Sequence, residues 1–129
     1  MAFKRLHKPR TRVGDQPATI TIGSTHSRPG ASRQVYLSIS GKARQMLGDP
    51  AAIALEWDPD EWLLRIVAAS PDDPDAYRLG KTPRIGITGI ARELGWMWDI
   101  AAIIPVKPQG RTAVLADLSQ VRTRKQVAA

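Results

Sequence analysis

The chain has 129 residues, of which 43% are hydrophobic, and a net charge of +7, which fits one folded domain with its own core. It contains no cysteine, which excludes disulfide bonds and thiolate chemistry, and its two histidines lack the spacing of metal ligands. No apolar run approaches the roughly 18 residues of a membrane-spanning helix, and the basic start lacks the apolar stretch of a secretory signal, so we expect a cytoplasmic protein.

Positive and negative charges are separated along the chain. Residues 1–44 carry nine Lys or Arg against one acid, Asp15, whereas residues 49–75 carry eight acids against one cation, Arg65. The end turns basic again at Arg122, Arg124 and Lys125. This distribution indicates a cationic face or arm with a polyanion as its partner, although basic termini also serve solubility alone.

The first segment, residues 1–17, is basic and has few large apolar side chains, so we expect a flexible arm. A single β-barrel-like domain is then expected over residues 18–118. It begins with Ala18–Gly23, whose apolar and β-branched alternation predicts a strand, and continues through a wide turn over Ser24–Ser32.

A first structural unit covers about residues 34–67. Its β-branched and aromatic residues predict a strand over Gln34–Ile39, followed by a short helix with Ser40 as N-cap and Gly48 as left-handed cap. The spacing of three apolar residues places one helix face on the core; they are Ala43, Met46 and Leu47.

A β-hairpin completes this unit. Strands over Ile53–Trp57 and Trp62–Val67 flank Asp58-Pro59-Asp60-Glu61, whose residues favour a tight turn. Trp57 and Trp62 either pack across the two strands or stack on a ligand, and we favour packing because such pairs at hairpin ends are normally structural.

A Pro- and Asp-rich linker covers residues 68–82, with a short strand at Tyr77–Leu79, and a second unit covers about 83–118. We expect a strand over Arg84–Ile87, Thr88 as the N-cap of a helix to Leu94, and Gly95 as its cap. Two closing strands are expected over Ile100–Val106 and Thr112–Leu118, and a frayed basic tail over 119–129.

The two units are near-repeats. Leu37–Gly48 returns as Ile85–Gly95, and the matched pairs are Ile39 with Ile87, Gly41 with Gly89, Ala43 with Ala91 and Arg44 with Arg92. A segment that recurs with its turns and caps intact predicts two copies of one supersecondary unit. The fold class is therefore predicted as β-rich α+β, a single small barrel built from two strand-helix-hairpin repeats with short helices.

Few residues suit catalysis. The chain has no Gly-rich phosphate loop, His7 and His26 are isolated, and the acids in turns do not follow a calcium-loop pattern. We therefore expect a protein that is not an enzyme and that binds no metal or cofactor.

Cations recur at matched places in the two units. Arg44 and Arg92 are equivalent on the helices, and Arg33 and Arg84 each precede or begin the strand of a repeat. A guanidinium group binds phosphate through two hydrogen bonds and also reads the edge of guanine. Equally, these side chains face solvent with their aliphatic stems covering the barrel.

The order of strand, Ser or Thr, short helix, Leu-Gly and hairpin resembles the swapped-hairpin β-barrel regulators of the AbrB type. Two copies in one chain resemble the tandem MraZ arrangement, in which both halves complete one barrel. Arg84–Gly95 matches best, with Arg84 at the family's strand Arg and Arg92 at its helix Arg. In the first copy Tyr36 takes the place of Arg84, and Arg44 keeps the helix position.

The resemblance implies a DNA-binding transcriptional regulator, a monomer or homodimer, and the Arg-rich, Lys-poor composition suits a high-GC bacterium or its phage. Basic residues of the repeats and the arm are the predicted contacts to double-stranded DNA: Arg84, Arg92, Lys42, Arg44, Arg33, Lys4, Arg5, Lys8, Arg10 and Arg12. The alternative is a protein-interaction module, for example a phage protein that inhibits a host protein through an exposed patch of Trp96, Met97 and Trp98.

Overall fold

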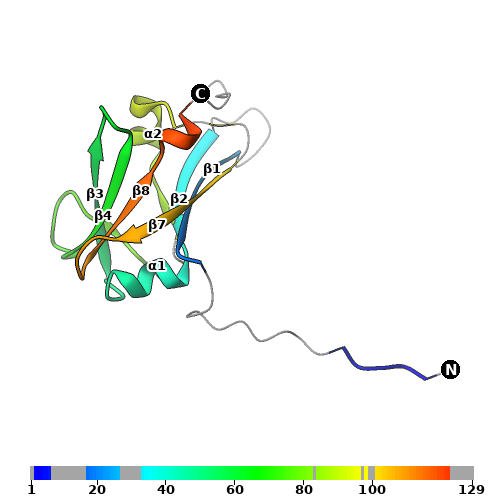
Figure 1. Ribbon diagram of the computed structural model, residues 1–129. Helices are drawn as coiled ribbons and strands as arrows, with labels where there is room; N and C mark the ends of the chain where they lie inside the picture. The colour runs from blue at the N-terminus through cyan, green and yellow to red at the C-terminus, as the bar shows by residue number, and fades with distance from the viewer. Residues whose placement is uncertain are drawn as a thin grey trace.

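The computed structural model describes residues 2–6, 17–26, 33–82, 84–96, 98 and 101–122. Within these ranges eight strands form one antiparallel sheet that curls into a nearly closed barrel with two short helices (Figure 1). The strand order is β5-β3-β4-β8-β7-β1-β2-β6. The predicted β-rich α+β barrel is confirmed.

The elements follow the chain in the predicted order. When each unit is extended to include the strand before its repeat, the first unit contains β1 (Thr19–His26), β2 (Arg33–Ile39), α1 (Gly41–Met46), β3 (Ala52–Asp58) and β4 (Leu63–Ala69). The second contains β5 (Tyr77–Arg78), β6 (Arg84–Gly86), α2 (Thr88–Leu94), β7 (Ala102–Pro108) and β8 (Ala113–Asp117).

Strand pairing shows that the sequence repeat is also a structural repeat. Exchanging the two units turns the β1·β7 pair into β5·β3 and the β3·β4 hairpin into β7·β8, and all four pairs are present. The pairs β2·β6 and β4·β8 map onto themselves. A pseudo-two-fold axis therefore passes through both, and in β2·β6 Leu37 lies opposite Ile85, its own equivalent.

The barrel stops short of closure at one place. The exchange that relates the units would turn β1·β2 into a β5·β6 pair, but β5 and β6 are the two edges of the described sheet. Turns occupy the preceding Pro- and Asp-rich linker: Ala76 N–H donates to the Asp73 carbonyl at 3.1 Å, and Asp75 N–H to the Asp73 side chain at 2.9 Å. Because these turns precede it directly, strand β5 is only two residues long.

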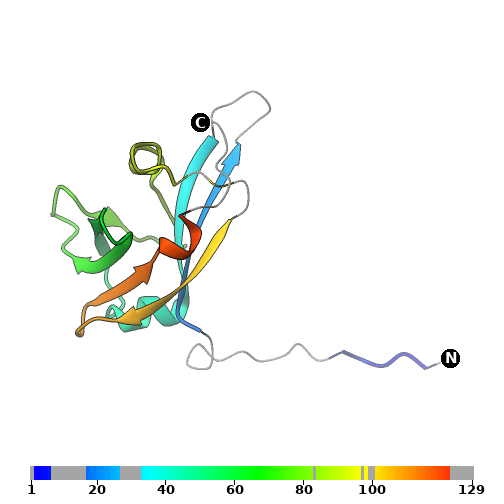
Figure 2. The same cartoon turned by 45° about the horizontal axis from the view of Figure 1, so that its top comes forward.

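Alternating apolar residues fill the interior. Ile20, Ile22, Leu37, Ile39 and Ile104 are at most 1% exposed, and the described part of the chain buries no polar or charged side chain. The helices cover opposite ends of the barrel, with α1 at the bottom and α2 at the top of Figure 1, an arrangement that Figure 2 confirms. Among the described residues neither helix has the length and hydropathy needed to cross a bilayer.

The two helices end alike but begin differently. Gly48 and Gly95 have φ of 83° and 77°, the left-handed conformation expected of both. Ser40 caps α1 as predicted, since its Oγ accepts from the Ala43 N–H at 3.2 Å.

The predicted N-cap at Thr88 is wrong. Helix α2 begins at Thr88 itself, and the capping position falls to Ile87, which has no side-chain hydrogen bond to the helix. Thr88 Oγ1 instead accepts from the Val35 N–H at 3.0 Å and donates to Gln34 Oε1 at 3.2 Å. The hydroxyl group thus ties the start of α2 to the start of β2.

The tryptophans at the first hairpin are structural, as predicted. Asp58 Oδ1 accepts from the N–H groups of Asp60 and Glu61 and closes the turn. Trp57 packs edge-to-face on Trp62, with ring centroids 5.4 Å apart, and on Trp96 at 4.9 Å.

The structure describes only part of the two termini. The expected frayed tail is wrong at its start, because Ser119–Val121 form a 3₁₀ turn, η2, whose Val121 is buried, and Arg122 lies over the Trp62 ring at 5.2 Å. Residues 123–129 lie outside the described ranges. Residues 2–6 of the arm have no regular structure, and Phe3 and Leu6 are 95% and 89% exposed.

Replacing Ser40 by Ala removes an acceptor shared by two backbone groups, since Ser40 Oγ also accepts from the Thr19 N–H at 3.0 Å. We expect the free energy of unfolding, measured by urea denaturation, to fall by about 1–2 kcal/mol. The control is Ser70→Ala, which removes an exposed acceptor for the Asp72 N–H and should cost under about 0.5 kcal/mol. Equal losses in the two variants would contradict this role of Ser40.

Candidate nucleic-acid interface

The two broad outer faces of the barrel differ in charge. Because side chains alternate along each strand, the outward positions of β1, β2 and β6 are those of Thr19, Thr21, Gly23, Thr25, Gln34, Tyr36, Ser38, Arg84 and Gly86, with no acid among them. We call this the β2 face. The outward positions of β3, β4 and β8 include Glu56, Asp58 and Asp117, and Arg65 is bound to Glu56 at 2.6 Å.

Several cations gather at the barrel end that α1 covers. Arg44 donates from Nη1 to the Gly80 carbonyl at 3.2 Å, which joins α1 to the segment before β6. Arg84 begins β6 and lies opposite Ser38, near the end of β2. The cationic edge, as we name this group, consists of Lys42, Arg44, Arg78, Lys81 and Arg84.

Two members of this edge were missed by the sequence analysis. Arg78 and Lys81 fall in the linker, where acids dominate the local charge. Their place depends on the β3·β5 pair, in which Arg78 lies opposite Ala52, the residue that begins β3 after α1. A lone short strand in a charged linker carries no sequence signal for that pairing.

The basic arm joins the barrel beside α1 (Figure 1). Thr19, the first residue of β1, bonds Ser40 twice: its N–H donates to Ser40 Oγ and its carbonyl accepts from the Ser40 N–H, both at 3.0 Å. Lys4 and Arg5 precede this anchor within the described residues, whereas Lys8, Arg10 and Arg12 lie outside them. The arm is therefore attached to the barrel at the α1 end.

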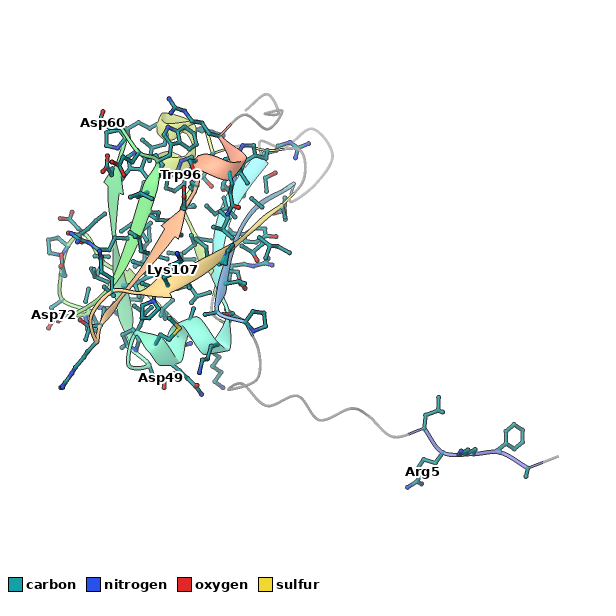
Figure 3. All side chains as sticks on the ribbon, viewed as in Figure 1. Arg5, Asp49, Asp60, Asp72, Trp96 and Lys107 are labelled. Atoms are coloured by element: carbon teal, nitrogen blue, oxygen red, sulfur yellow. The ribbon has the colours of Figure 1, made fainter. Side chains whose placement is uncertain are left out.

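Acids bound the cationic edge on its other side. Figure 3 places Asp49 and Asp72 at the α1 end as well, and Asp60 at the opposite end. Linker residue Asp72 follows β4, so it lies on the side of β3 and β4 rather than on the β2 face. The favourable approach for an anion is therefore restricted to the side that β2 and β6 form.

The remaining predicted cations are elsewhere. Arg92 is exposed on α2, at the opposite end from α1. Arg33 begins β2 near that same end and donates from Nη1 to Ser24 Oγ at 3.0 Å. The predicted contacts that lie within the described residues thus do not form one surface, because the repeat places equivalent helices at opposite ends of the barrel.

Two titratable groups among the described residues have pKa values shifted from the ordinary ones. The pKa of Asp117 is lowered because its carboxylate accepts hydrogen bonds from the Ser119 hydroxyl and N–H, with a smaller attraction from Lys107. The pKa of Tyr77 is raised by burial. Asp117, like an ordinary aspartate, is ionised at neutral pH and would repel a polyanion approaching β4 and β8.

An open groove of about 280 Å³ runs over that acidic face; it is lined by Glu56, Trp57, Asp58, Leu63, Arg65, Gln109 and Leu115. The carboxylate of Glu56 is held by Arg65, and that of Asp58 closes the hairpin turn. No group of three or more metal-ligating side chains occurs among the residues that the structure describes. Both carboxylates of the groove are thus engaged within the hairpin itself.

The exposed patch expected at Trp96–Trp98 is a wrong prediction for both tryptophans. Trp96 and Trp98 are 1% and 2% exposed, and Met97 lies outside the described residues. After Gly95 the chain turns inward, and Trp96 packs on Trp57. Large apolar side chains are exposed elsewhere, at Phe3, Leu6 and Ile103.

Comparisons with protein-family models, with curated proteins and with solved structures found no match for this chain. The barrel is established by its strand pairing, and the resemblance to AbrB-type regulators rests on the motif residues alone.

Because Trp96 is a core residue, Trp96→Ala should lower the free energy of unfolding by about 3–5 kcal/mol. Ile103→Ala, at a position 68% exposed, should change it by under about 1 kcal/mol. Urea denaturation monitored by circular dichroism measures both. If Trp96→Ala lowers the free energy of unfolding by as little as the control does, Trp96 is not a core residue.

Proposed function

We propose that this protein binds double-stranded DNA through the cationic edge, with the basic arm adding contacts to neighbouring phosphates. The observation that carries the proposal is the gathering of Lys42, Arg44, Lys81 and Arg84 beside the point where the arm leaves the barrel. These cations come from two separate stretches of the sequence, residues 42–44 and 81–84, and the tertiary fold brings them together next to a face without acids.

The physics of duplex binding favours this arrangement. Each cation that neutralises a phosphate releases condensed counterions, so a cluster of cations supplies affinity without any base contact. Hydroxyl groups such as those of Thr21 and Ser38 also donate to phosphate oxygens. The acidic face behind β4 and β8 repels the duplex and thereby selects the orientation of binding.

The resemblance to the AbrB type supports the same function. The nearly closed barrel consists of two strand-helix-hairpin units, and the resemblance implies a tandem arrangement of this kind. A transcriptional regulator in the cytoplasm of a bacterium, or encoded by its phage, is the role that fits both lines of support.

One observation still supports the rival role as a protein-interaction module. Ile103 is 68% exposed on β7, opposite Thr21 at the border of the β2 face. A single exposed Ile among short polar side chains is a smaller apolar surface than the tryptophan patch expected from the sequence. We therefore place DNA binding first.

Fluorescence anisotropy with a labelled duplex of about 20 base pairs tests the proposal. We expect log Kd to change linearly with log salt between about 50 and 200 mM, with a slope of about 0.9 for each phosphate neutralised. Lys42→Ala combined with Lys81→Ala should reduce that slope by about two.

The matched control removes the same charge elsewhere. Arg92→Ala combined with Lys107→Ala changes one residue at the α2 end and one at an outward position on the acidic side, and should leave the slope nearly unchanged. An affinity that does not depend on salt, or no binding to any duplex, would refute the proposed function.

A further inference from the structure

We propose that Tyr36 is a positioning residue that holds the Arg84 guanidinium group in one orientation, and that Arg84 is consequently the side chain by which this protein distinguishes duplex sequences. The inference rests on the DNA binding proposed above and adds which contact carries specificity.

The two side chains are equivalents in the repeat that meet across the pseudo-two-fold axis. Tyr36 and Arg84 flank the axial pair Leu37 and Ile85 in the β2·β6 ladder. They are diagonal neighbours on one outer face, a separation that an aromatic ring and a long side chain can span. The Arg84 Cζ atom lies 3.8 Å from the Tyr36 ring centroid, a close cation–π contact.

Gly23, which has no side chain, leaves the space that the Tyr36 ring occupies. On β1, Gly23 lies directly opposite Tyr36, and a Cβ atom added there would lie 2.5 Å from Tyr36 Oη and 2.6 Å from Cζ. Gly86, opposite Tyr36 on β6, has open space where its Cβ would be. The ring therefore leans onto β1 over Gly23, and the guanidinium group lies over the ring.

Divergence of the two copies creates this support. Arg at both positions would set two guanidinium groups against each other across the axis, and their repulsion would drive them apart. With Tyr36 in one copy, the remaining cation gains a flat, attractive surface. The rotamer freedom that an exposed Arg normally loses on binding is already restricted in the free protein.

A fixed guanidinium plane suits base reading more than phosphate binding. A bidentate contact to guanine N7 and O6 demands one orientation of the fork, whereas a phosphate can also be bound by a lysine, which acts as a flexible point charge. Lys42 and Lys81 are such point charges, and Arg44 already donates to the Gly80 carbonyl. Arg84 is thus the member of the cationic edge whose orientation is supported by an aromatic ring.

The test begins with selection of a preferred duplex from a random pool by the full-length protein. Kd is then measured for this duplex and a scrambled one, together with the salt slope. The ratio of interest is Kd for the scrambled duplex divided by Kd for the preferred one. Tyr36→Leu should reduce this ratio about 10-fold or more and leave the salt slope unchanged, because no cation is lost. Tyr36→Phe keeps the ring and should retain the ratio.

Two glycine variants separate positioning from general destabilisation. Gly23→Ala displaces the ring and should lower the ratio as Tyr36→Leu does, whereas Gly86→Ala, on the same face, should leave it unchanged. Arg84→Lys keeps the charge and should also lower the ratio. In NMR spectra the Arg84 side-chain protons should be shifted upfield by the ring in wild type and Tyr36→Phe but not in Tyr36→Leu.

The outcomes are distinguishable from failure of the proposed function. Salt-dependent binding with an unchanged ratio in Tyr36→Leu and Gly23→Ala overturns the inference and leaves DNA binding in place, as does binding by wild type without any sequence preference. Loss of the ratio in Tyr36→Phe as well would mean that the hydroxyl group, not the ring, matters, and also overturns it. No binding by wild type overturns both.

Discussion

The antiparallel pair of β2 and β6 is the contact on which the rest of the structure depends. It joins the two copies across the pseudo-two-fold axis, with Leu37 against Ile85 and both side chains in the core. The Ile87 N–H extends the ladder to the Val35 carbonyl at 2.9 Å, and this bond sets where α2 starts. Without this pair, each unit would present an unpaired strand edge and an unburied apolar face, which neither unit can cover alone.

The β2·β6 pair also determines which side chains meet on the outer face of the barrel. An antiparallel register of two equivalent strands brings equivalent residues close to the axis, so a substitution in one copy acts directly on its counterpart. Tyr36 and Arg84 are the outcome on the outer face. The exchange also sends the two helices to opposite ends of the barrel, and for this reason Arg44 and Arg92, although equivalent in sequence, belong to separate surfaces. Internal symmetry here distributes charge rather than concentrating it, and the concentration at the α1 end arises because cations of α1, of the linker and of the start of β6 meet there beside the arm.

Local chemistry made much of the fold predictable. Ser40 and the glycines at 48 and 95 act within one helical turn, and the Asp58–Glu61 turn closes through its own side chain, so residue type suffices to place them. Thr88 was misplaced because its hydroxyl group had two available partners, the helix backbone and β2, and only the tertiary ladder selects between them. Trp96 was misplaced because an apolar run after a helix has no periodicity that tells surface from core.

The sequence by itself determined the repeat, the order of elements, the core-facing side of the first helix and the separation of charges along the chain, because these depend on periodicity and on neighbours a few residues away. The tertiary structure alone decided that β5 approaches β3, that Arg44 meets Gly80, and that Arg84 rests on Tyr36 above Gly23. These contacts join residues 13 to 48 positions apart, so they form only when the barrel curls and its register is set. The candidate interface therefore depends on tertiary contacts, which local sequence patterns do not specify.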